Sequence, residues 1–162
     1  MTTTAKKTTT KKDPLELPLK PFAFEVFNLT SKQRSKAKKV EILQEYANDA
    51  LKVLLVWNFD DTAISVIPKG TVPYTENEVP VGTDHTSLRV EYKHLFNFVK
   101  GGNDSLTSLR RETMFIQILE GLHPDEAKIL CLVKDKELQT KYKLTYEVVR
   151  EAYPDIKWGG RS

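Results

Sequence analysis

The strongest constraint in this sequence is a helical spacing of apolar residues that recurs in separate short segments. Val40, Leu43 and Ala47 follow this spacing in one of them, and prolines or glycines lie between several of the segments. A residue at every third or fourth position lies on one face of an α-helix. The pattern therefore predicts an all-α fold, a compact bundle of six or seven helices with little sheet. The expected helices cover 22–29, 31–47, 50–59, 87–100, 105–122, 125–134 and 145–153.

Two segments lack this helical pattern. Residues 62–83 contain Pro68, Gly70, Pro73, Pro80 and Gly82, which prevent a long helix. We expect a long irregular loop here, with one short strand or a hairpin in the β-like segment 63–68. Loops of this length are often functional. The second segment, 135–144, is a polar connector between the last two expected helices.

The length of 162 residues predicts a single domain. We assign it to 21–158, with a disordered basic Thr/Lys/Pro tail at 1–20 and a flexible end at 159–162. No apolar stretch approaches the length of about 20 residues that a membrane helix needs, so we expect no membrane association. The single cysteine, Cys131, excludes an internal disulfide, and a reducing cytoplasm is the default location.

The apolar stripes also indicate which residues form the core. The sequence contains no catalytic motif beside them. Neither a phosphate-binding glycine loop nor a hydrolase or metalloprotease motif is present. Cys131 lies among apolar residues and is expected to be a buried hydrophobe. Three scattered histidines do not suggest a metal site, so we expect no enzyme, metal or cofactor. The predicted core includes Val40, Leu43, Leu51, Leu54, Leu95, Phe96, Phe115, Leu119, Ile129 and Val148.

Positive charge is concentrated at the start of the chain. Ten lysines and arginines against three acids give residues 1–40 a net charge of +7, which leaves −4 on the rest, because the total is +3. Such asymmetry favours an anionic partner at one face. A solubilising tail with a solvated helix face is the alternative, and charge alone leaves both open.

Two basic clusters lie at expected helix ends. The first, with Lys32, Arg34, Lys36 and Lys39, belongs to the helix that we expect Ser31 to cap. Lysine and arginine side chains contact phosphates, and so do the backbone N–H groups at helix N-termini. The alternative interpretation of each cluster is a hydrated helix end. The second cluster comprises Lys134, Lys136, Lys141 and Lys143, interleaved with Gln139, Thr140, Tyr142 and Thr145.

The segment 106–154 resembles the closing part of the helical N-terminal DNA-binding domain of ATP-dependent DNA ligases, particularly the T-even phage type. The matching parts are Pro124-Asp125-Glu126-Ala127, the apolar run 129–132, the connector 136–143 and Val148 to Pro154. Residues 29–59 resemble the opening helical pair of that domain, so the similarity covers about 22–156. The chain also resembles small proteins of T-even-like phages that infect cyanobacteria.

This resemblance implies a module that binds duplex DNA through its phosphate backbone. The chain lacks the Lys-x-Asp-Gly motif of ligases, so it is not a ligase by itself. Where cellular ligases favour glycine in the connector, this chain has Lys141. Our leading hypothesis is a non-catalytic DNA-binding module acting in replication, repair or host takeover, in the cytoplasm of an infected host. The alternative is a protein-interaction or virion-associated adaptor. The tail is a candidate contact for a phage or host replication protein. The expected DNA-binding residues are Lys32, Arg34, Lys36, Lys39, Lys136, Gln139, Lys141, Lys143 and Thr145.

Overall fold

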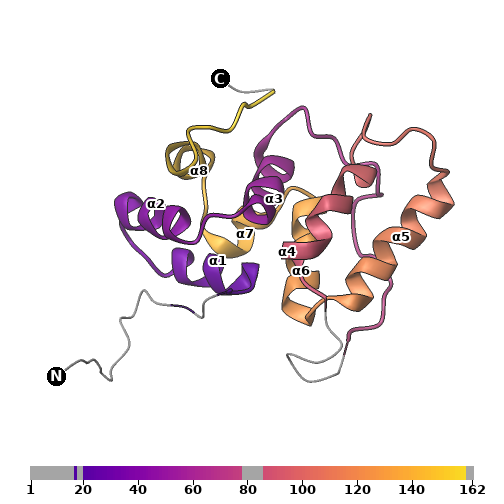
Figure 1. Ribbon diagram of the computed structural model, residues 1–162, viewed down its shortest axis with the longest axis horizontal. Helices are drawn as coiled ribbons and strands as arrows, with labels where there is room; N and C mark the ends of the chain where they lie inside the picture. Colours follow the sequence, from indigo (N-terminus) through magenta and orange to yellow (C-terminus); the bar gives the residue numbers. More distant parts are fainter. Residues whose placement is uncertain (1–16, 18–19, 78–85, 160–162) are drawn as a thin grey trace.

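The computed structural model describes residues 17, 20–77 and 86–159. This part of the chain contains eight α-helices and one 3-10 helix. The predicted all-α fold is confirmed (Figure 1). The elements are α1 Ala23–Ser31, α2 Lys36–Glu45, α3 Asp49–Phe59, α4 Leu88–Glu91, η1 Tyr92–Phe98, α5 Ser108–Gly121, α6 Pro124–Lys134, α7 Leu138–Tyr142 and α8 Tyr146–Ala152.

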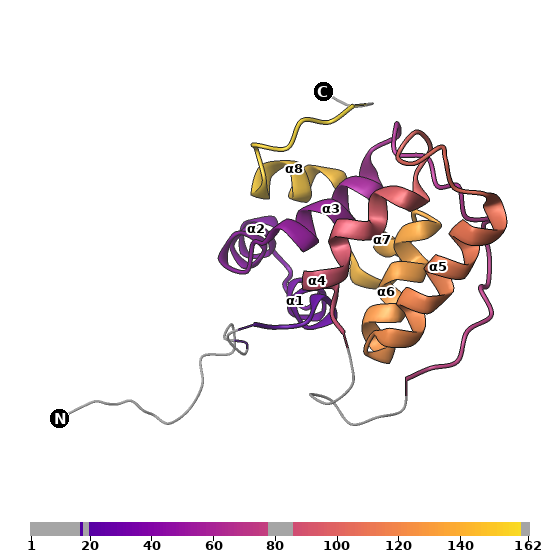
Figure 2. The same cartoon turned by 45° about the vertical axis from the view of Figure 1, so that its right-hand side comes forward.

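The helices form two groups that meet along α3. On one side α2 packs against α1 and α8, and on the other α5 covers the outer side of α6 (Figures 1 and 2). Helix α3 contacts α6, α4 and η1, and α7 contacts α1 and α6. Segments from both ends of the chain, α2 and α8, therefore lie side by side.

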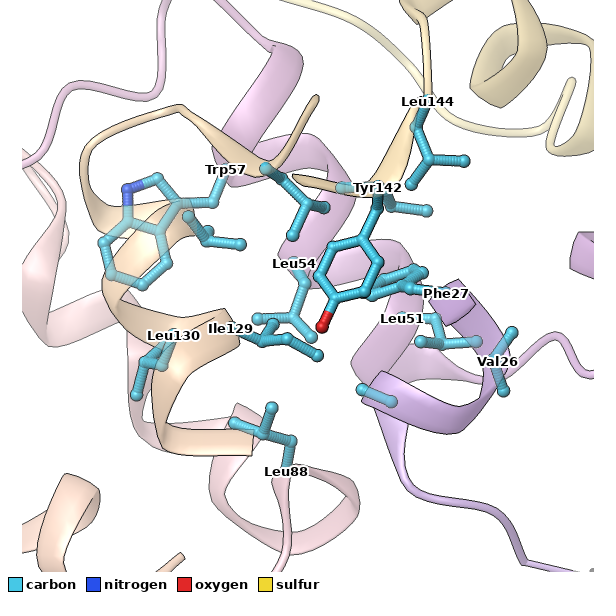
Figure 3. Close-up of a cluster of buried hydrophobic side chains, with 14 of the residues drawn as sticks. Val26, Phe27, Leu51, Leu54, Trp57, Leu88, Ile129, Leu130, Tyr142 and Leu144 are labelled. Carbon is cyan, nitrogen blue, oxygen red and sulfur yellow. The ribbon is translucent and has the colours of Figure 1, made fainter. Parts of the chain in front are cut away.

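One contiguous set of buried side chains fills the space between these groups. Tyr142 is 2% exposed and its ring lies 5.7 Å from that of Phe27, with Leu51, Leu54 and Ile129 around the pair (Figure 3). Nine of the ten predicted core residues are buried, which confirms the pattern: Val40, Leu43, Leu51, Leu54, Leu95, Phe115, Leu119, Ile129 and Val148.

Phe96 is the exception, because the expected helix 87–100 changes type. After one turn of α4 the chain continues as the 3-10 helix η1. A 3-10 helix has three residues per turn, so Tyr92, Leu95 and Phe98 share one face. Leu95 and Phe98 are buried, whereas Phe96 is 51% exposed. The prediction that Phe96 is a core residue was wrong.

Glu126 joins three helices through its buried carboxylate. Oε2 accepts the backbone N–H of Ala23 and Oε1 accepts that of Leu88, both at 2.9 Å. These are the first residues of α1 and α4, so one side chain on α6 satisfies a donor at the start of two other helices. Burial raises the pKa of Glu126 above its ordinary value, although both N–H groups and Arg89 oppose this.

The boundary between the first two helices differs from the prediction. Helix α1 runs to Ser31, and α2 begins only after Ser35, whose side chain accepts the N–H of Lys38. Gln33 donates to the carbonyl of Leu29 and so satisfies the end of α1. Ser31 is therefore the last residue of one helix and not the cap of the next.

The two segments expected to be irregular also contain order. The connector 135–144 includes the short helix α7, whose Leu138 and Tyr142 are buried. In the loop 62–83, Ser65 forms a single antiparallel bridge with Val99, so the expected strand is reduced to one residue pair. Residues 78–83 of that loop lie outside the described residues.

Of the expected tail 1–20, only Leu17 and Lys20 belong to the described residues. Of the expected flexible end 159–162, only Gly159 does. Leu17 donates its backbone N–H to the Tyr46 hydroxyl. Among the helices of the described part, none is long and apolar enough to span a bilayer.

Candidate nucleic-acid interface

The two basic clusters meet at a single hydrogen bond. Nζ of Lys39 on α2 donates to the backbone carbonyl of Lys143, at a distance of 2.7 Å. Lys36, one turn earlier on α2, forms an ion pair with Glu151 of α8 at 3.1 Å. We call Lys36, Lys39 and Lys143 the basic patch. It lies where α2 meets α8 and the residues before it (Figure 1).

The basic patch continues into the turn between α1 and α2. Lys32 and Arg34 are exposed in this turn, and not on a helix as predicted, because α2 begins at Lys36. Neither cation forms an ion pair with a described residue, and the same holds for Lys39 and Lys143. Among the cations of the basic patch and this turn, only Lys36 is therefore paired with a described acidic residue.

Lys143 has an unusual backbone conformation. Its φ of 36° lies in the left-handed region, where an L-residue costs about 1–2 kcal/mol. This conformation ends α7 and turns the chain so that Leu144 is buried, while the Lys143 side chain is exposed. The strained turn thus directs the carbonyl of Lys143 toward Lys39 and leaves the ammonium of Lys143 in solvent.

Lys141 and Thr145 flank this turn in different surroundings. Lys141 is exposed, lies 5.4 Å from the centre of the Tyr142 ring, and borders a hollow that also contains Asp135 and Glu137. The Thr145 hydroxyl accepts the N–H of Val148 at 3.3 Å and caps α8. Their contacts with DNA stay predictions.

Lys136 is held by the end of another helix. Its Nζ donates to the backbone carbonyls of Trp57 and Asp60, at the C-terminus of α3. With φ of 58° it occupies the left-handed position after α6, where N–H of Glu137 bonds to the carbonyl of Leu132. Because its ammonium serves the backbone carbonyls at the end of α3, we assign Lys136 a structural role and do not include it among the proposed phosphate contacts.

Gln139 belongs to the same structural network. Its Oε1 accepts from Asn58 Nδ2 and its Nε2 donates to the carbonyl of Lys136, both at 2.9 Å. Asn58, which is buried, also accepts the N–H of Leu138. The amide of Gln139 therefore ties α7 to the end of α3, and we do not include this residue among the proposed DNA contacts.

Lys134 is the clearest departure from the expected surface cluster. Its side chain is fully buried, and Nζ donates to the carbonyls of Pro68 and Gly70 while pairing with Asp135. The lysine thereby fastens the loop after α3 to the end of α6. It has no exposed atom to offer to DNA.

Cys131 and His94 carry nucleophilic or metal-ligating groups within the described part of the chain. Cys131 is half-buried, and burial raises its pKa to about 11, which keeps the thiol protonated at neutral pH. His94 is exposed. Within the described residues no group of three or more His, Cys, Asp or Glu side chains could hold a metal ion.

A second surface feature is an open apolar groove between α3 and η1. Its volume is about 430 Å³. The charged residues along it are Lys52 and Lys93. Sequence patterns missed this groove because they assigned Phe96 to the core. Its walls are Val53, Val56 and Trp57 from α3 and Tyr92, Leu95 and Phe96 from η1.

Fold and surface together define a small all-α protein with a basic patch and a separate apolar groove. The chain belongs to DUF6433, a family of unknown function whose model matches residues 26–140. Searches of curated proteins and of solved structures found no match. The matched range includes α2 and ends before Lys141 and Lys143. None of these comparisons bears on the resemblance to the ligase domain, which stays a prediction.

Proposed function

We propose that this protein is a non-catalytic module that binds duplex DNA through the phosphate backbone, largely independently of sequence. The observation that carries the proposal is the hydrogen bond from Lys39 to the carbonyl of Lys143. It joins two lysine clusters that are far apart in the sequence into one patch. Phosphate contacts of this kind supply affinity without reading bases.

The proposal assigns phosphate contacts to the cations around that bond, all of which are exposed except the half-buried Lys39. They are Lys32, Arg34, Lys36, Lys39 and Lys143, with Lys141 and Thr145 beside them. Lys36 exchanges Glu151 for phosphate, which costs little because exposed ion pairs contribute about 0–1 kcal/mol. From the resemblance to the ligase domain, we propose that the protein acts in replication, repair or host takeover, in the cytoplasm of an infected host.

A charge reversal within the patch tests this function. The binding of a fluorescent duplex is measured by anisotropy for the wild type, Lys39→Glu and Lys100→Glu. Lys100 is exposed in the loop between η1 and α5, and this loop lies on the other side of the molecule from α2 (Figures 1 and 2). We expect Lys39→Glu to weaken binding by about tenfold or more, which is about 1.4 kcal/mol. Equal affinities for all three proteins would reject the patch.

Sequence independence is tested with the same assay. Two duplexes of equal length and unrelated sequence should bind the wild type with nearly equal affinity, because phosphate contacts carry no base information. A large preference for one duplex would show that bases are read.

The apolar groove favours a second candidate, the adaptor. Its exposed Phe96 is the kind of surface that a protein partner covers. An adaptor without DNA binding would give no anisotropy change with either duplex.

A further inference from the structure

We propose that the groove between α3 and η1 binds an amphipathic helix of a partner protein that carries acidic residues beside its apolar face. The site is independent of the basic patch, since no residue of that patch lines the groove. The protein would then hold DNA on one surface and a protein on another.

The apolar lining of this groove is partly open to solvent. Phe96 is 51% exposed at its rim, and Val53 and Val56 are half-buried along α3. All three line the same groove. Single exposed apolar residues are ordinary, whereas a continuous apolar surface marks an interaction site.

The shape of the groove fits a helix. Two helices, α3 and η1, form its walls, and the volume of about 430 Å³ lies within the range of sites that take several apolar groups. An amphipathic helix presents such groups at positions three or four residues apart. The groove is open to solvent, so a segment of chain can lie along it.

The charge along the groove favours an acidic partner. Lys52 and Lys93 line the groove, and none of its described lining residues is acidic. Lys52 is already paired with Asp155 at 3.0 Å, but Lys93 is exposed and forms no ion pair with a described residue. An acidic residue beside the apolar face of the partner would pair with Lys93.

The same charge argues against a second copy of this chain as the occupant. In a two-fold symmetric dimer the same surface meets itself, so Lys93 from both copies would approach one interface. Like charges brought together in this way are unfavourable. A partner of opposite charge avoids this cost.

The test is a selection from displayed peptides of about four helical turns. One face of each peptide is fixed as apolar, and the other positions vary among Glu, Lys, Gln and Ser. We expect the selected peptides to be acidic, and to shift the amide resonances of α3 and η1 in the full-length protein.

Three substitutions locate the binding site. Phe96→Glu and Val56→Glu should each weaken peptide binding by about tenfold or more, and Lys93→Glu should remove the preference for acidic peptides. Leu109→Glu, a matched change at a residue that is 78% exposed on α5, should leave binding unchanged. Circular dichroism confirms the fold of each variant, and Phe96→Glu carries the test if Val56→Glu unfolds.

Several outcomes would overturn the proposal. They are a selection that yields no binder, binders that are basic or neutral, and binders that Phe96→Glu does not affect. A dimer in light scattering that Phe96→Glu dissociates would assign the groove to a second copy. Lys39→Glu should leave peptide binding unchanged, so failure of the DNA proposal is distinguishable from failure of this one.

Discussion

The ammonium of Lys39 donates to the backbone carbonyl of Lys143, 104 positions further along the chain. The carbonyl is available because Lys143 adopts a left-handed conformation at the end of α7. A loss of this turn would therefore remove the hydrogen bond between α2 and the connector as well as displacing a charge. Charges that serve DNA and charges that serve the fold should therefore respond differently to substitution.

Replacing Lys141 and Lys143 together by alanine should reduce the salt dependence of DNA binding. Each phosphate contact contributes about 0.9 to the slope of log K against log salt, so the double variant should lose roughly 1.8 if both touch phosphate. Both side chains are exposed, so the free energy of unfolding should change by about 0.5 kcal/mol or less from lost contacts. Lys93→Ala with Lys100→Ala is the control, and a parental slope in the connector variant would favour the adaptor.

Lys136 should behave in the opposite way. Lys136→Ala removes the donor to the carbonyls of Trp57 and Asp60, so the protein should lose about 1–3 kcal/mol of stability in urea unfolding. The salt slope of DNA binding should stay the same. Lys136→Gly should be about 1 kcal/mol more stable than Lys136→Ala, because glycine adopts the left-handed conformation without strain. Equal stability of the two variants would contradict the backbone argument.

Glu126 should give folding a specific pH dependence. Because burial raises its pKa, the folded state holds the proton more tightly than the unfolded chain, whose ordinary value is 4.5. Between 4.5 and the raised value, the free energy of unfolding therefore falls as pH rises. Glu126→Gln removes this contribution, so the stability of the wild type relative to the variant should decrease over that interval. A relative stability that increases with pH would show that the pKa is lowered.

Glu126→Ala examines the hydrogen bonds themselves. It leaves the N–H groups of Ala23 and Leu88 buried without their acceptor. Each such group costs about 1–3 kcal/mol, so we expect a large loss of stability in urea unfolding. A loss below about 0.5 kcal/mol would contradict the role of Glu126 in joining α1 and α4.

The neighbours Leu95 and Phe96 test the 3-10 geometry of η1. Leu95 is 1% exposed, and Leu95→Ala should cost about 2–5 kcal/mol of unfolding free energy. Phe96→Ala should cost far less, because half of that ring is in solvent. Similar losses at the two positions would indicate an α-helix with Phe96 turned inward.

Apolar spacing was sufficient for the fold class and for most of the core. It was not sufficient for residues 92–98, since a change from 3.6 to 3 residues per turn alters which side chains share a face. The N-cap of α2 was predicted at Ser31, which precedes lysine-rich residues. The structure instead continues α1 through Ser31 and caps α2 with Ser35.

The candidate site was harder to predict than the fold. Lysines close together in the sequence have different roles: Lys134 and Lys136 bind carbonyls of segments more than 60 residues away, and Lys143 is exposed. The composition of a segment does not reveal such distant acceptors. In the same way, nothing in the residues around Glu126 indicates that its carboxylate oxygens accept hydrogen bonds from the first residues of two other helices.

The central claim is tested most directly by the salt dependence of wild-type binding to duplex DNA, measured by anisotropy. Four to six phosphate contacts predict a slope of log K against log salt of about −3.6 to −5.4. The dissociation constant should be about 10⁻⁴–10⁻⁶ M near physiological salt. A slope near zero, or no binding at 50 mM salt, where electrostatic binding is strong, would contradict the account.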